Sequence, residues 1–567
     1  MSYKNFGLAI YCTVGDLTRI DDIDIFAKKF EFMEKHLQID KVYLETYRGG
    51  LFIEKEKMLK IKEFFNKKGI KTSGGITTTV EPKTSLMGAF CYTTQSNLDY
   101  LRNVVEFTAG LFDELILDDF YFTNCRCESC IAAKGSRSWS EFRTDLMRDV
   151  SENYIIKPAK KINPNINVII KFPNWYENYQ DSGYNLKDQP KQFDMIYTGT
   201  ETRDPENTQQ HLPRYLSYFV MRYLENVKPG KNGGGWFDPF GCTYSLNSYA
   251  EQAYLTLFSK PKEVTLFCLG MLLMNEYRIF VPMAGYVFET VDSFIDNLGN
   301  PQGVACYLPY HSYKEDYLHN YVGMLGIPLE PQPDYPSDSD VMFLTASAAF
   351  DKDLVSKIKA SLREGKRIFI TSGLLSELEG KGLEEITSIR STGRKAYVNT
   401  FAVEGGVCSF KNHYKSAEKF IIPQIDYATN DSKQVIVAMD GDNNFPVLLE
   451  SRFGKGYLYV LAIPDNFSDL YNYPAEVLTQ IRALMAGKLP VFLGGESRIG
   501  LFVYDNDTFV IESFLSHNQD IPLTVNHGDA KLVDIASQME IKGCSAEGKT
   551  KFNVAMGPGT YRVFKIK

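Results

Sequence analysis

The stretch Asp113–Cys130, DELILDDFYFTNCRCESC, is the part of the sequence from which we interpret the fold. Leu115–Leu117 is a short apolar run, and Asp118 and Asp119 end it. Such a run is typical of a parallel strand that is buried on both faces. Two acids at the end of a buried strand are costly unless they are paired or have a function. The stretch therefore predicts an active-site strand, followed by a segment that its three cysteines hold in place.

Length and composition limit the classes of protein to consider. The chain has 567 residues, which corresponds to three or four domains, and its 44% hydrophobic and 23% charged residues are ordinary for a soluble protein. A net charge of −8 argues against a nucleic-acid or anionic-membrane partner, because both need a basic surface. No run approaches the roughly 18 apolar residues of a spanning helix, and no secretory signal opens the chain. We therefore expect a cytoplasmic protein.

The first 300 residues alternate between strand-like and helix-like segments. The expected strands are Gly7–Thr13, Lys41–Glu45, Lys71–Thr78, Glu114–Asp119, Asn167–Phe172, Asp194–Thr198, Gly233–Phe237 and Glu263–Leu269. The expected helices are Ile23–His36, Lys55–Lys68, Ser96–Phe112, Ser140–Ile162, Gln209–Asn226 and Ser245–Phe258, with an apolar helix at about Val281–Leu298. Eight strands separated mostly by helices predict a (β/α)8 TIM barrel over residues 1–299, whose chemistry lies on the loops after the strands.

Two further domains are expected after the barrel. Residues 300–488 restart an α/β pattern, with strands at Val304–Leu308, Val341–Leu344 and Arg367–Thr371 and a helix at Asp353–Glu364. This part lacks the Gly-x-Gly-x-x-Gly motif of dinucleotide sites. From residue 489 to residue 567 helical periodicity disappears, and short, evenly spaced strands predict a small antiparallel β-sandwich.

The cysteine cluster predicts a metal site. Cys125, Cys127 and Cys130 supply three soft ligands within six residues, and a structural zinc site needs four. Cys91 is the best fourth ligand, because it follows the third expected strand and so lies on the same barrel face. The alternative is that three free thiols are close together by chance.

Acidic residues gather after the strands of the expected barrel. Asp119 is our first choice for a catalytic residue because it ends a buried strand. Asp118 should point the opposite way, because neighbouring side chains alternate along a strand, and it is then a structural partner. The second carboxylate is Glu201, after the sixth strand, or Asp238, after the seventh. If Glu201 is the partner, Asp119 is an alternative candidate for the nucleophile. Paired carboxylates across a cleft are the machinery of glycoside hydrolysis, and their separation decides between retention and inversion. The alternative is that these acids pair with arginines and only stabilise loops.

Other residues on the same loops are expected to bind substrate. Trp175 and Trp236 lie just past strand ends, and their flat faces suit the C–H surface of a sugar ring. The alternative is that they are core residues that plug the barrel mouth. The remaining expected substrate-binding residues are Glu45, Arg48, Tyr176 and Arg203.

The residues Asn-Cys-Arg-Cys-Glu-Ser-Cys-Ile-Ala-Ala, after an acid at the fourth strand, resemble glycoside hydrolase family 42, the β-galactosidases. The resemblance implies zinc on Cys91, Cys125, Cys127 and Cys130. It also implies the order barrel, flavodoxin-like trimerisation domain, β-sandwich. That family has Asn-Glu at the end of the fourth strand and a nucleophilic Glu at the seventh. This chain has Asp118-Asp119 and Asp238 there, which indicates a related glycosidase family rather than a β-galactosidase.

The sequence thus predicts a zinc-containing, cytoplasmic glycoside hydrolase that removes a terminal sugar from a small glycan and forms a homo-oligomer, expected to be a trimer. One alternative is a catalytically inactive barrel that binds carbohydrate. Another is a sugar lyase or epimerase that uses the acids with Tyr176 or Tyr244.

Overall fold

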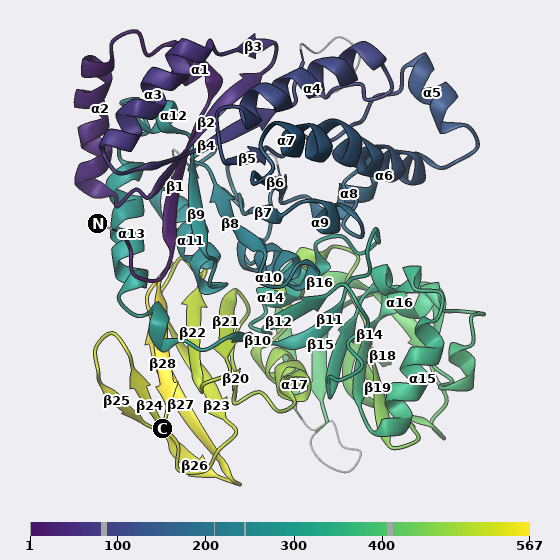
Figure 1. The fold of residues 1–567 in the computed structure, drawn as a ribbon. Helices are drawn as coiled ribbons and strands as arrows, with labels where there is room; N and C mark the ends of the chain where they lie inside the picture. Colours follow the sequence, from purple (N-terminus) through teal and green to yellow (C-terminus); the bar gives the residue numbers. More distant parts are fainter. Residues whose placement is uncertain (1, 81–87, 209, 243–244, 405–411) are drawn as a thin grey trace. The chain divides into compact units, whose positions relative to one another are not determined.

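The computed structural model describes residues 2–80, 88–208, 210–242, 245–404 and 412–567. The chain divides into two compact units, residues 1–296 and 297–567, and each unit is described by itself. Figure 1 shows their elements coloured along the chain. The division of the chain into domains at residues 299/300 and 488/489 stays a prediction.

The first unit is a closed barrel of eight parallel strands, which confirms the predicted fold class. β1 pairs with both β9 and β2, and the order β1-β9-β8-β7-β6-β5-β4-β2 completes the ring. A short strand, β3 (Leu51–Phe52), pairs antiparallel with the end of β2. The barrel strands are β1 (Gly7–Cys12), β2 (Lys41–Arg48), β4 (Lys71–Thr77), β5 (Glu114–Leu117), β6 (Asn167–Phe172), β7 (Met195–Gly199), β8 (Asn232–Phe237) and β9 (Glu263–Phe267).

Helices follow these strands and cover the barrel (Figure 1). An amphipathic helix such as α2 buries one apolar face, with Phe26, Phe30 and Met33, whereas α11 is buried along every residue from Ser248 to Phe258. The helix expected from Gln209 begins at Leu216, because Pro213 has no amide hydrogen to donate inside a helix. The helices are α1 (Val14–Thr18), α2 (Ile23–His36), α3 (Lys55–Lys67), α4 (Gln95–Ala109), α5 (Glu128–Lys134), α6 (Trp139–Val150), α7 (Lys157–Ile162), α8 (Tyr179–Ser182), α9 (Gln189–Gln192), α10 (Leu216–Val227), α11 (Leu246–Phe258), α12 (Leu269–Leu272) and α13 (Phe280–Asp292).

A lysine closes the floor of the barrel, where the strands begin. Lys41, the first residue of β2, contacts Glu114 and Glu263 at 2.8 Å each, and these are the first residues of β5 and β9. The hydroxyl groups of Tyr43 and Tyr197 donate to Glu263 at 3.0 and 3.1 Å. Each of these charged groups has a partner of opposite charge. Such pairing is needed because a charge that is removed from water without a partner is costly.

The second unit contains a nine-stranded sheet that is only partly α/β. Its parallel part, β12-β11-β13-β14-β19, has the 2-1-3-4-5 strand order of flavodoxin-like folds. Antiparallel strands β18, β17, β15 and β16 extend it, among them a long hairpin absent from the sequence prediction. The strands are β11 (Val304–Tyr307), β12 (Leu329–Gln332), β13 (Val341–Leu344), β14 (Arg367–Thr371), β15 (Arg390–Val403), β16 (His413–Asp426), β17 (Ser432–Asp440), β18 (Asn443–Phe453) and β19 (Gly456–Leu461). The helices are α14 (Leu318–Gly323), α15 (Leu354–Glu364), α16 (Ser372–Glu377) and α17 (Ala475–Ala486).

The C-terminal part of this unit consists of two antiparallel sheets, as predicted. Their orders are β10-β21-β22-β28-β24-β25 and β20-β23-β27-β26, and their inner faces share one apolar core. The strands are β10 (Pro301–Gln302), β20 (Val491–Leu493), β21 (Ile499–Tyr504), β22 (Thr508–Ser513), β23 (Gln519–Val525), β24 (Lys531–Asp534), β25 (Glu540–Lys542), β26 (Cys544–Ala546), β27 (Lys549–Met556) and β28 (Tyr561–Ile566).

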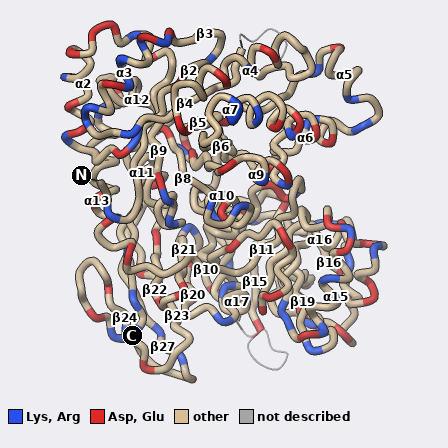
Figure 2. Tube along the Cα trace, viewed as in Figure 1, with Lys and Arg blue, Asp and Glu red and all other residues tan. Residues whose placement is uncertain are grey.

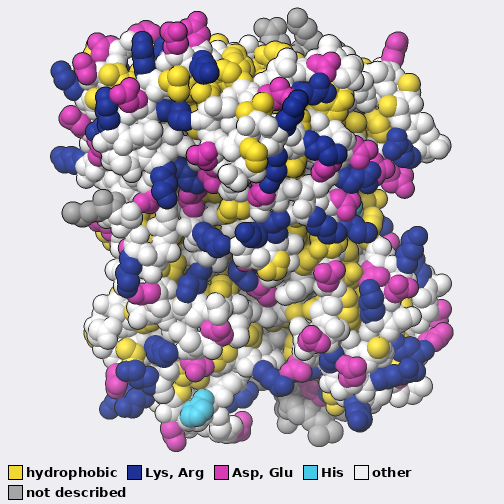
Figure 3. Space-filling model, in the orientation of Figure 1, with side chains coloured by type: hydrophobic (Ala, Val, Ile, Leu, Met, Phe, Trp, Pro, Cys, Tyr) yellow, Lys and Arg dark blue, Asp and Glu magenta, His cyan; other side chains and the backbone are white. Residues whose placement is uncertain are grey.

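Charges of both signs are mixed along the surface helices of the barrel unit, including α2 and α6 (Figure 2). The face drawn in Figure 3 likewise interleaves acidic and basic side chains. None of the described helices combines the length and the apolar content that crossing a membrane requires.

Candidate active site and cysteine cluster

A cavity of about 330 Å³ opens where the barrel strands end. This is the end at which TIM barrels carry their chemistry. Side chains that follow most of the strands converge on it, and they combine aromatic rings with charged groups. The lining residues are Arg48, Asp118, Asp119, Phe120, Phe122, Lys171, Asn174, Trp175, Glu201, Arg203, Gln210, Trp236, Asp238, Phe240 and Phe267.

Asp118 and Asp119 both line this cavity, so the expectation that they point in opposite directions is wrong. β5 ends at Leu117, and the alternation of side chains holds only within a strand. The two carboxylates have different partners. Arg48 donates to Asp118 at 2.8 Å, whereas Lys171 contacts Asp119 at 2.7 Å.

Lys171 is the central charge of the site, and the sequence prediction missed it. It lies in β6 with its side chain 2% exposed, and its Nζ contacts Asp119 Oδ2 at 2.7 Å and Glu201 Oε1 at 3.0 Å. Asp118 is a third carboxylate, at 3.6 Å. The Nζ also lies 4.1 Å from the centre of the Trp236 ring, a cation–π distance. The sequence does contain an indication of this role, because Lys171 is a charged residue inside the otherwise largely apolar strand Asn167–Phe172.

Glu201 reaches the cavity from the loop after β7. Its backbone carbonyl accepts a hydrogen bond from the side-chain amide of Asn174. Gly199, the last residue of β7, leaves room for the carboxylate: a Cβ at this position would lie 2.6 Å from Glu201 Oε2. The local sequence therefore needs a glycine two residues before the acid.

Burial and neighbouring charges separate the proton affinities of these acids. Burial is the main reason that the pKa of Asp119 rises to about 7; Lys171 opposes the rise, and the charges of Asp118 and Glu201 add to it. Burial would also raise the pKa of Asp118, but the charges of Lys171 and Arg48 outweigh it and leave that pKa below its usual value. Burial is likewise the largest reason that the pKa of Glu201 is raised. At neutral pH the site therefore contains both ionised and protonated carboxyl groups.

The two arginines at the mouth are paired with acids. Arg203 donates to both oxygens of Asp238, at 3.0 and 2.8 Å. Arg48 bonds Glu45 at 3.0 Å as well as Asp118. Glu45 is fully buried and does not line the cavity, and it contacts the site through Arg48 and through the Thr77 hydroxyl, which lies 3.1 Å from Asp118 Oδ2.

The expected aromatic residues differ in position. Trp175 lines the cavity and packs edge-on against Phe122, with ring centres 5.5 Å apart. Trp236 is 1% exposed and forms the base of the cavity under Lys171. Tyr176 is not among the lining residues, because its ring packs against Phe219 outside the cavity. Tyr244 lies outside the described residues.

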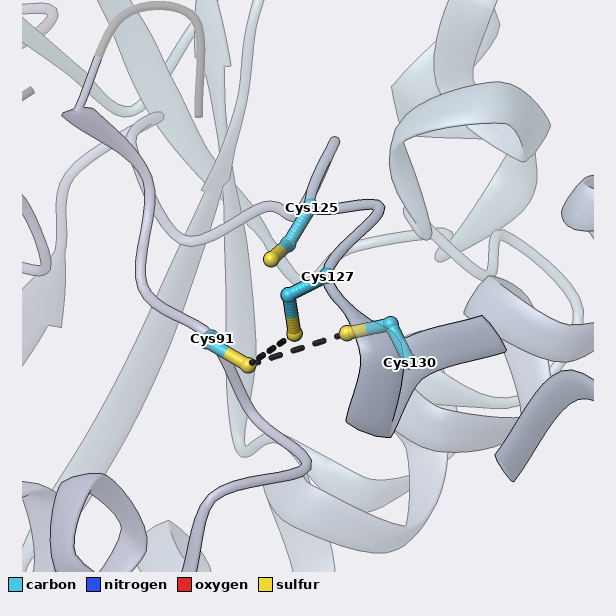
Figure 4. Close-up of side chains that lie close together, drawn as sticks. All are labelled: Cys91, Cys125, Cys127 and Cys130. Atoms are coloured by element: carbon cyan, nitrogen blue, oxygen red, sulfur yellow. Dashed lines mark hydrogen bonds between the residues drawn. The ribbon is translucent and has the colours of Figure 1, made fainter. Parts of the chain in front are cut away.

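The four cysteines that the sequence singled out do come together. Their sulfur atoms all lie within 4.8 Å of one another, and Cys91 Sγ is 3.6 Å from Cys127 Sγ and from Cys130 Sγ. Figure 4 shows Cys91 approaching from the segment before α4, and the other three from the loop after β5 and from α5. A tetrahedron with metal–sulfur distances of about 2.3 Å has sulfur–sulfur edges of about 3.8 Å. The group can therefore hold a metal ion.

Cations surround the aromatic side of this cluster. Trp139 packs against the cysteines, and Arg126, Lys134 and Arg143 lie over its ring at 5.6, 5.6 and 4.8 Å. Arg143 is 4% exposed, and its Nε and Nη2 have no hydrogen-bond partner among the described residues. This surrounding is complementary to a negatively charged centre.

Comparison with known proteins identifies the family. Residues 1–293 match the model described as "Probable glycosyl hydrolase, catalytic domain". The chain belongs to this family. It is thereby an enzyme of the glycosidase class. Residues 299–466 match the second domain of the uncharacterized protein SSO3021, and residues 490–566 match a probable glycosyl hydrolase C-terminal domain. SSO3021 of Saccharolobus solfataricus is 26% identical over 531 residues, covering 86% of this chain and 87% of that protein.

Solved structures of glycosidases share the fold over the whole chain. The β-galactosidase from Bacillus circulans sp. alkalophilus is 11% identical with a TM-score of 0.67, and the alignment covers 99% of each chain. α-L-Fucosidase isoenzyme 2 from Paenibacillus thiaminolyticus is 12% identical with a TM-score of 0.66, covering 100% of each chain. A catalytic mutant of Gan42B, a GH42 β-galactosidase from G. stearothermophilus, is 12% identical with a TM-score of 0.65, covering 99% of this chain and 98% of that one. These structures confirm the fold that the resemblance to family 42 implies.

Proposed function

We propose that this glycosidase removes a terminal sugar from a small glycan or glycoside, with Asp119 as general acid and base and Glu201 as nucleophile. The observation that supports this most is that both carboxylates contact the same ammonium group in the cavity, at 2.7 and 3.0 Å. The raised pKa of Asp119, about 7, keeps a proton available for the leaving group at neutral pH. Asp238 is the weaker choice for the nucleophile, because both of its oxygens bond Arg203.

The short distance between the two carboxylates favours retention of configuration. The oxygens of Asp119 and Glu201 that contact Lys171 are separated by no more than the sum of those two contacts. That limit is below the roughly 6.5–9.5 Å of inverting pairs, which need room for a water molecule. Glu201 would then attack the anomeric carbon directly and form a covalent intermediate.

The cavity suits a single terminal sugar. Its volume of about 330 Å³ is at the small end of the roughly 300–1,000 Å³ that ligand pockets span. Aromatic rings of Trp175, Phe122 and Phe240 form the walls, and Asn174 and Gln210 add hydrogen-bonding groups. This mixture of aromatic surface and polar groups is suited to the C–H faces and the hydroxyl groups of a sugar.

A panel of nitrophenyl glycosides, assayed from pH 4 to 9, tests the proposal. We expect hydrolysis of at least one glycoside, loss of that activity in Asp119→Asn and in Glu201→Gln, and products with retained configuration by NMR. Hydrolysis that survives in Glu201→Gln but not in Asp238→Asn would move the nucleophile to Asp238. Tight sugar binding without turnover would favour the catalytically inactive carbohydrate-binding barrel instead. Solvent deuterium in a sugar carbon would favour a lyase or epimerase.

We propose that the ion held by Cys91, Cys125, Cys127 and Cys130 is structural zinc. Four thiolates around a divalent ion carry two net negative charges, which the cations around Trp139 complement. The site would have no open position for a substrate. Metal analysis of the purified protein by mass spectrometry should find one zinc per chain, and none in Cys127→Ser.

We also propose that the protein is a cytoplasmic homotrimer assembled through residues 300–488. The hairpin β15–β16 carries Tyr397 and Ile421 opposite each other, with 56% and 40% of their surfaces exposed. Their exposed apolar surface is available for contact with another copy of the chain. Light scattering at micromolar concentration should give three times the chain mass of 64.5 kDa, and a monomer would contradict the assembly.

A further inference from the structure

Lys171 occupies a position that the proposed reaction does not by itself explain. Its Nζ is within hydrogen-bond distance of Asp119 and Glu201 at once, and its side chain is 2% exposed. Packing above Trp236, at 4.1 Å from the ring centre, fixes the ammonium from the other side. Because Lys171 belongs to the barrel strand β6, its position is fixed relative to the two carboxylates.

The charges that would change during the reaction belong to the two carboxylates that Lys171 touches. In the first step the proton of Asp119 passes to the glycosidic oxygen, and the bond between that oxygen and the anomeric carbon breaks. A carboxylate oxygen of Glu201 forms the new bond to the carbon. Glu201 thereby loses one negative charge and Asp119 gains one, so the pair holds one negative charge before and after the step.

From this geometry we propose that Lys171 is a positioning residue that serves as the fixed counter-charge of the catalytic pair. The single positive charge of Lys171 matches the single negative charge of the pair. The ammonium group contacts both of the carboxyl groups between which the negative charge moves. No reorganisation is needed when the charge passes from Glu201 to Asp119, or back when water releases the sugar. Fixed charges of this kind lower a barrier because they are already oriented. The inference rests on the proposed function.

The two arginines that line the cavity have other carboxylates as their ion-pair partners. Arg48 is engaged with Glu45 and Asp118, and Arg203 is engaged with Asp238. Lys171 approaches Asp118 only at 3.6 Å. Among the described lining residues of the cavity, Lys171 is therefore the cation that contacts Asp119 and Glu201.

Dependence on the leaving group separates this role from a purely structural one. We expect Lys171→Met to lower kcat/KM for an alkyl glycoside by about 10²–10³-fold, the cost of removing one oriented electrostatic group. For the dinitrophenyl glycoside of the same sugar, which leaves without a proton, Asp119 gains no charge. The loss should then be below about tenfold. Lys171→Arg keeps the charge and should recover part of the activity toward the alkyl glycoside.

Lys41→Met is the matched control, because Lys41 is also a lysine that bridges two carboxylates. It should leave the ratio between the two substrates unchanged. Equal losses for both substrates in Lys171→Met would overturn the inference.

A measurement without substrate keeps this inference separate from the proposed function. Infrared titration of the carboxyl band that Asp119→Asn removes should give a higher midpoint in Lys171→Met than in the original protein. An unchanged midpoint would show that Lys171 does not hold the charge of Asp119, and would overturn the inference. Failure of the original protein to hydrolyse any glycoside would instead contradict the proposed function, and the infrared result would stand.

Discussion

The barrel has a lysine at each end, Lys41 partly buried and Lys171 fully buried, and the carboxylates that the two lysines contact differ in proton affinity. At the floor, Lys41 contacts both Glu114 and Glu263, and tyrosine hydroxyls donate to Glu263 as well. Burial would raise the pKa of Glu114, but Lys41 outweighs it and leaves that pKa below its usual value. At the mouth, Lys171 faces three carboxylates, and the pKa of Asp119 is raised to about 7, chiefly by burial.

We infer from this difference that the ion pairs at the floor serve stability and that those at the mouth serve the proposed reaction. At the floor one lysine serves two carboxylates, and the side chains of Ser73 and Asn167 also donate to Glu114, at 2.9 and 2.8 Å. At the mouth burial outweighs the cations at Asp119, and its pKa of about 7 leaves this carboxyl group partly protonated at neutral pH. Perturbed pKa values of this kind mark functional sites. Chemistry at the mouth and stability at the floor is the division that TIM barrels follow.

The sharpest test replaces one acid at each end. Asp119→Asn removes the proton that the leaving group needs, and we expect kcat/KM to fall by about 10²–10⁴-fold while the melting temperature hardly changes. Glu114→Gln, its matched control at the floor, should keep kcat/KM within about threefold and lower the melting temperature. Steady-state kinetics and calorimetry on both variants measure this. The comparison fails if the two variants lose activity to the same extent.

Removing the floor lysine should cost stability rather than catalysis. Lys41→Met leaves Glu114 and Glu263 buried without a counter-charge, and we expect a loss of about 3 kcal/mol in the free energy of unfolding. Its side chain is 15% exposed, so the loss should be near the lower end of the range for buried pairs. Urea denaturation followed by circular dichroism gives the value. A change below about 1 kcal/mol would mean that the floor network is not structural.

Metal removal should affect the mouth and leave the floor unchanged. Cys127→Ser loosens the loop that follows β5, and a displacement of Asp119 by about 1 Å lowers the rate by about 100-fold. Kinetics after dialysis against a chelator, with zinc added back, measures the effect. Full activity in the metal-free protein would show that the metal bound by the cysteine cluster is not needed to position Asp119.

The pH dependence should differ between the two ends. Because Asp119 must be protonated as the general acid, kcat/KM should fall as pH rises through about 7. Glu114 has a folded-state pKa below its unfolded value, so the stability it contributes is present above the unfolded pKa of about 4.3 and is lost as pH falls through the folded pKa. Kinetics and thermal melting between pH 3 and 9 record both effects. A value of kcat/KM that stays constant through pH 7 would show that Asp119 is not the general acid.

The sequence predicts the barrel well because its strands are buried on both faces. The sequence predicts β6 with both of its observed ends, and it predicts the end of β5 two residues too late. The long hairpin β15–β16 was missed because its strands are largely polar and exposed, with irregular pairing that breaks the two-residue period. Its packing is decided by residues far away in the chain.

The candidate site was predicted in composition but not in its contacts. Asp119, Glu201 and the four cysteines lie where the order of strands and loops placed them. The orientation of Asp118 was wrong, because a sequence does not show at which residue a strand stops pairing. Lys171 was overlooked because a single lysine in an apolar strand acquires its meaning only when the acids that surround it in space are known.

The three tryptophans of the chain give the protein an optical readout of its own. Trp175 and Trp236 line the cavity of the candidate active site, and Trp139 packs against the cysteine cluster. Indole emission responds to nearby charge and to contact with a bound molecule. Intrinsic fluorescence should therefore report sugar binding through Trp175 and Trp236, and metal release through Trp139, without any label attached to the protein. Single Trp→Phe variants would assign each change in emission to its own site.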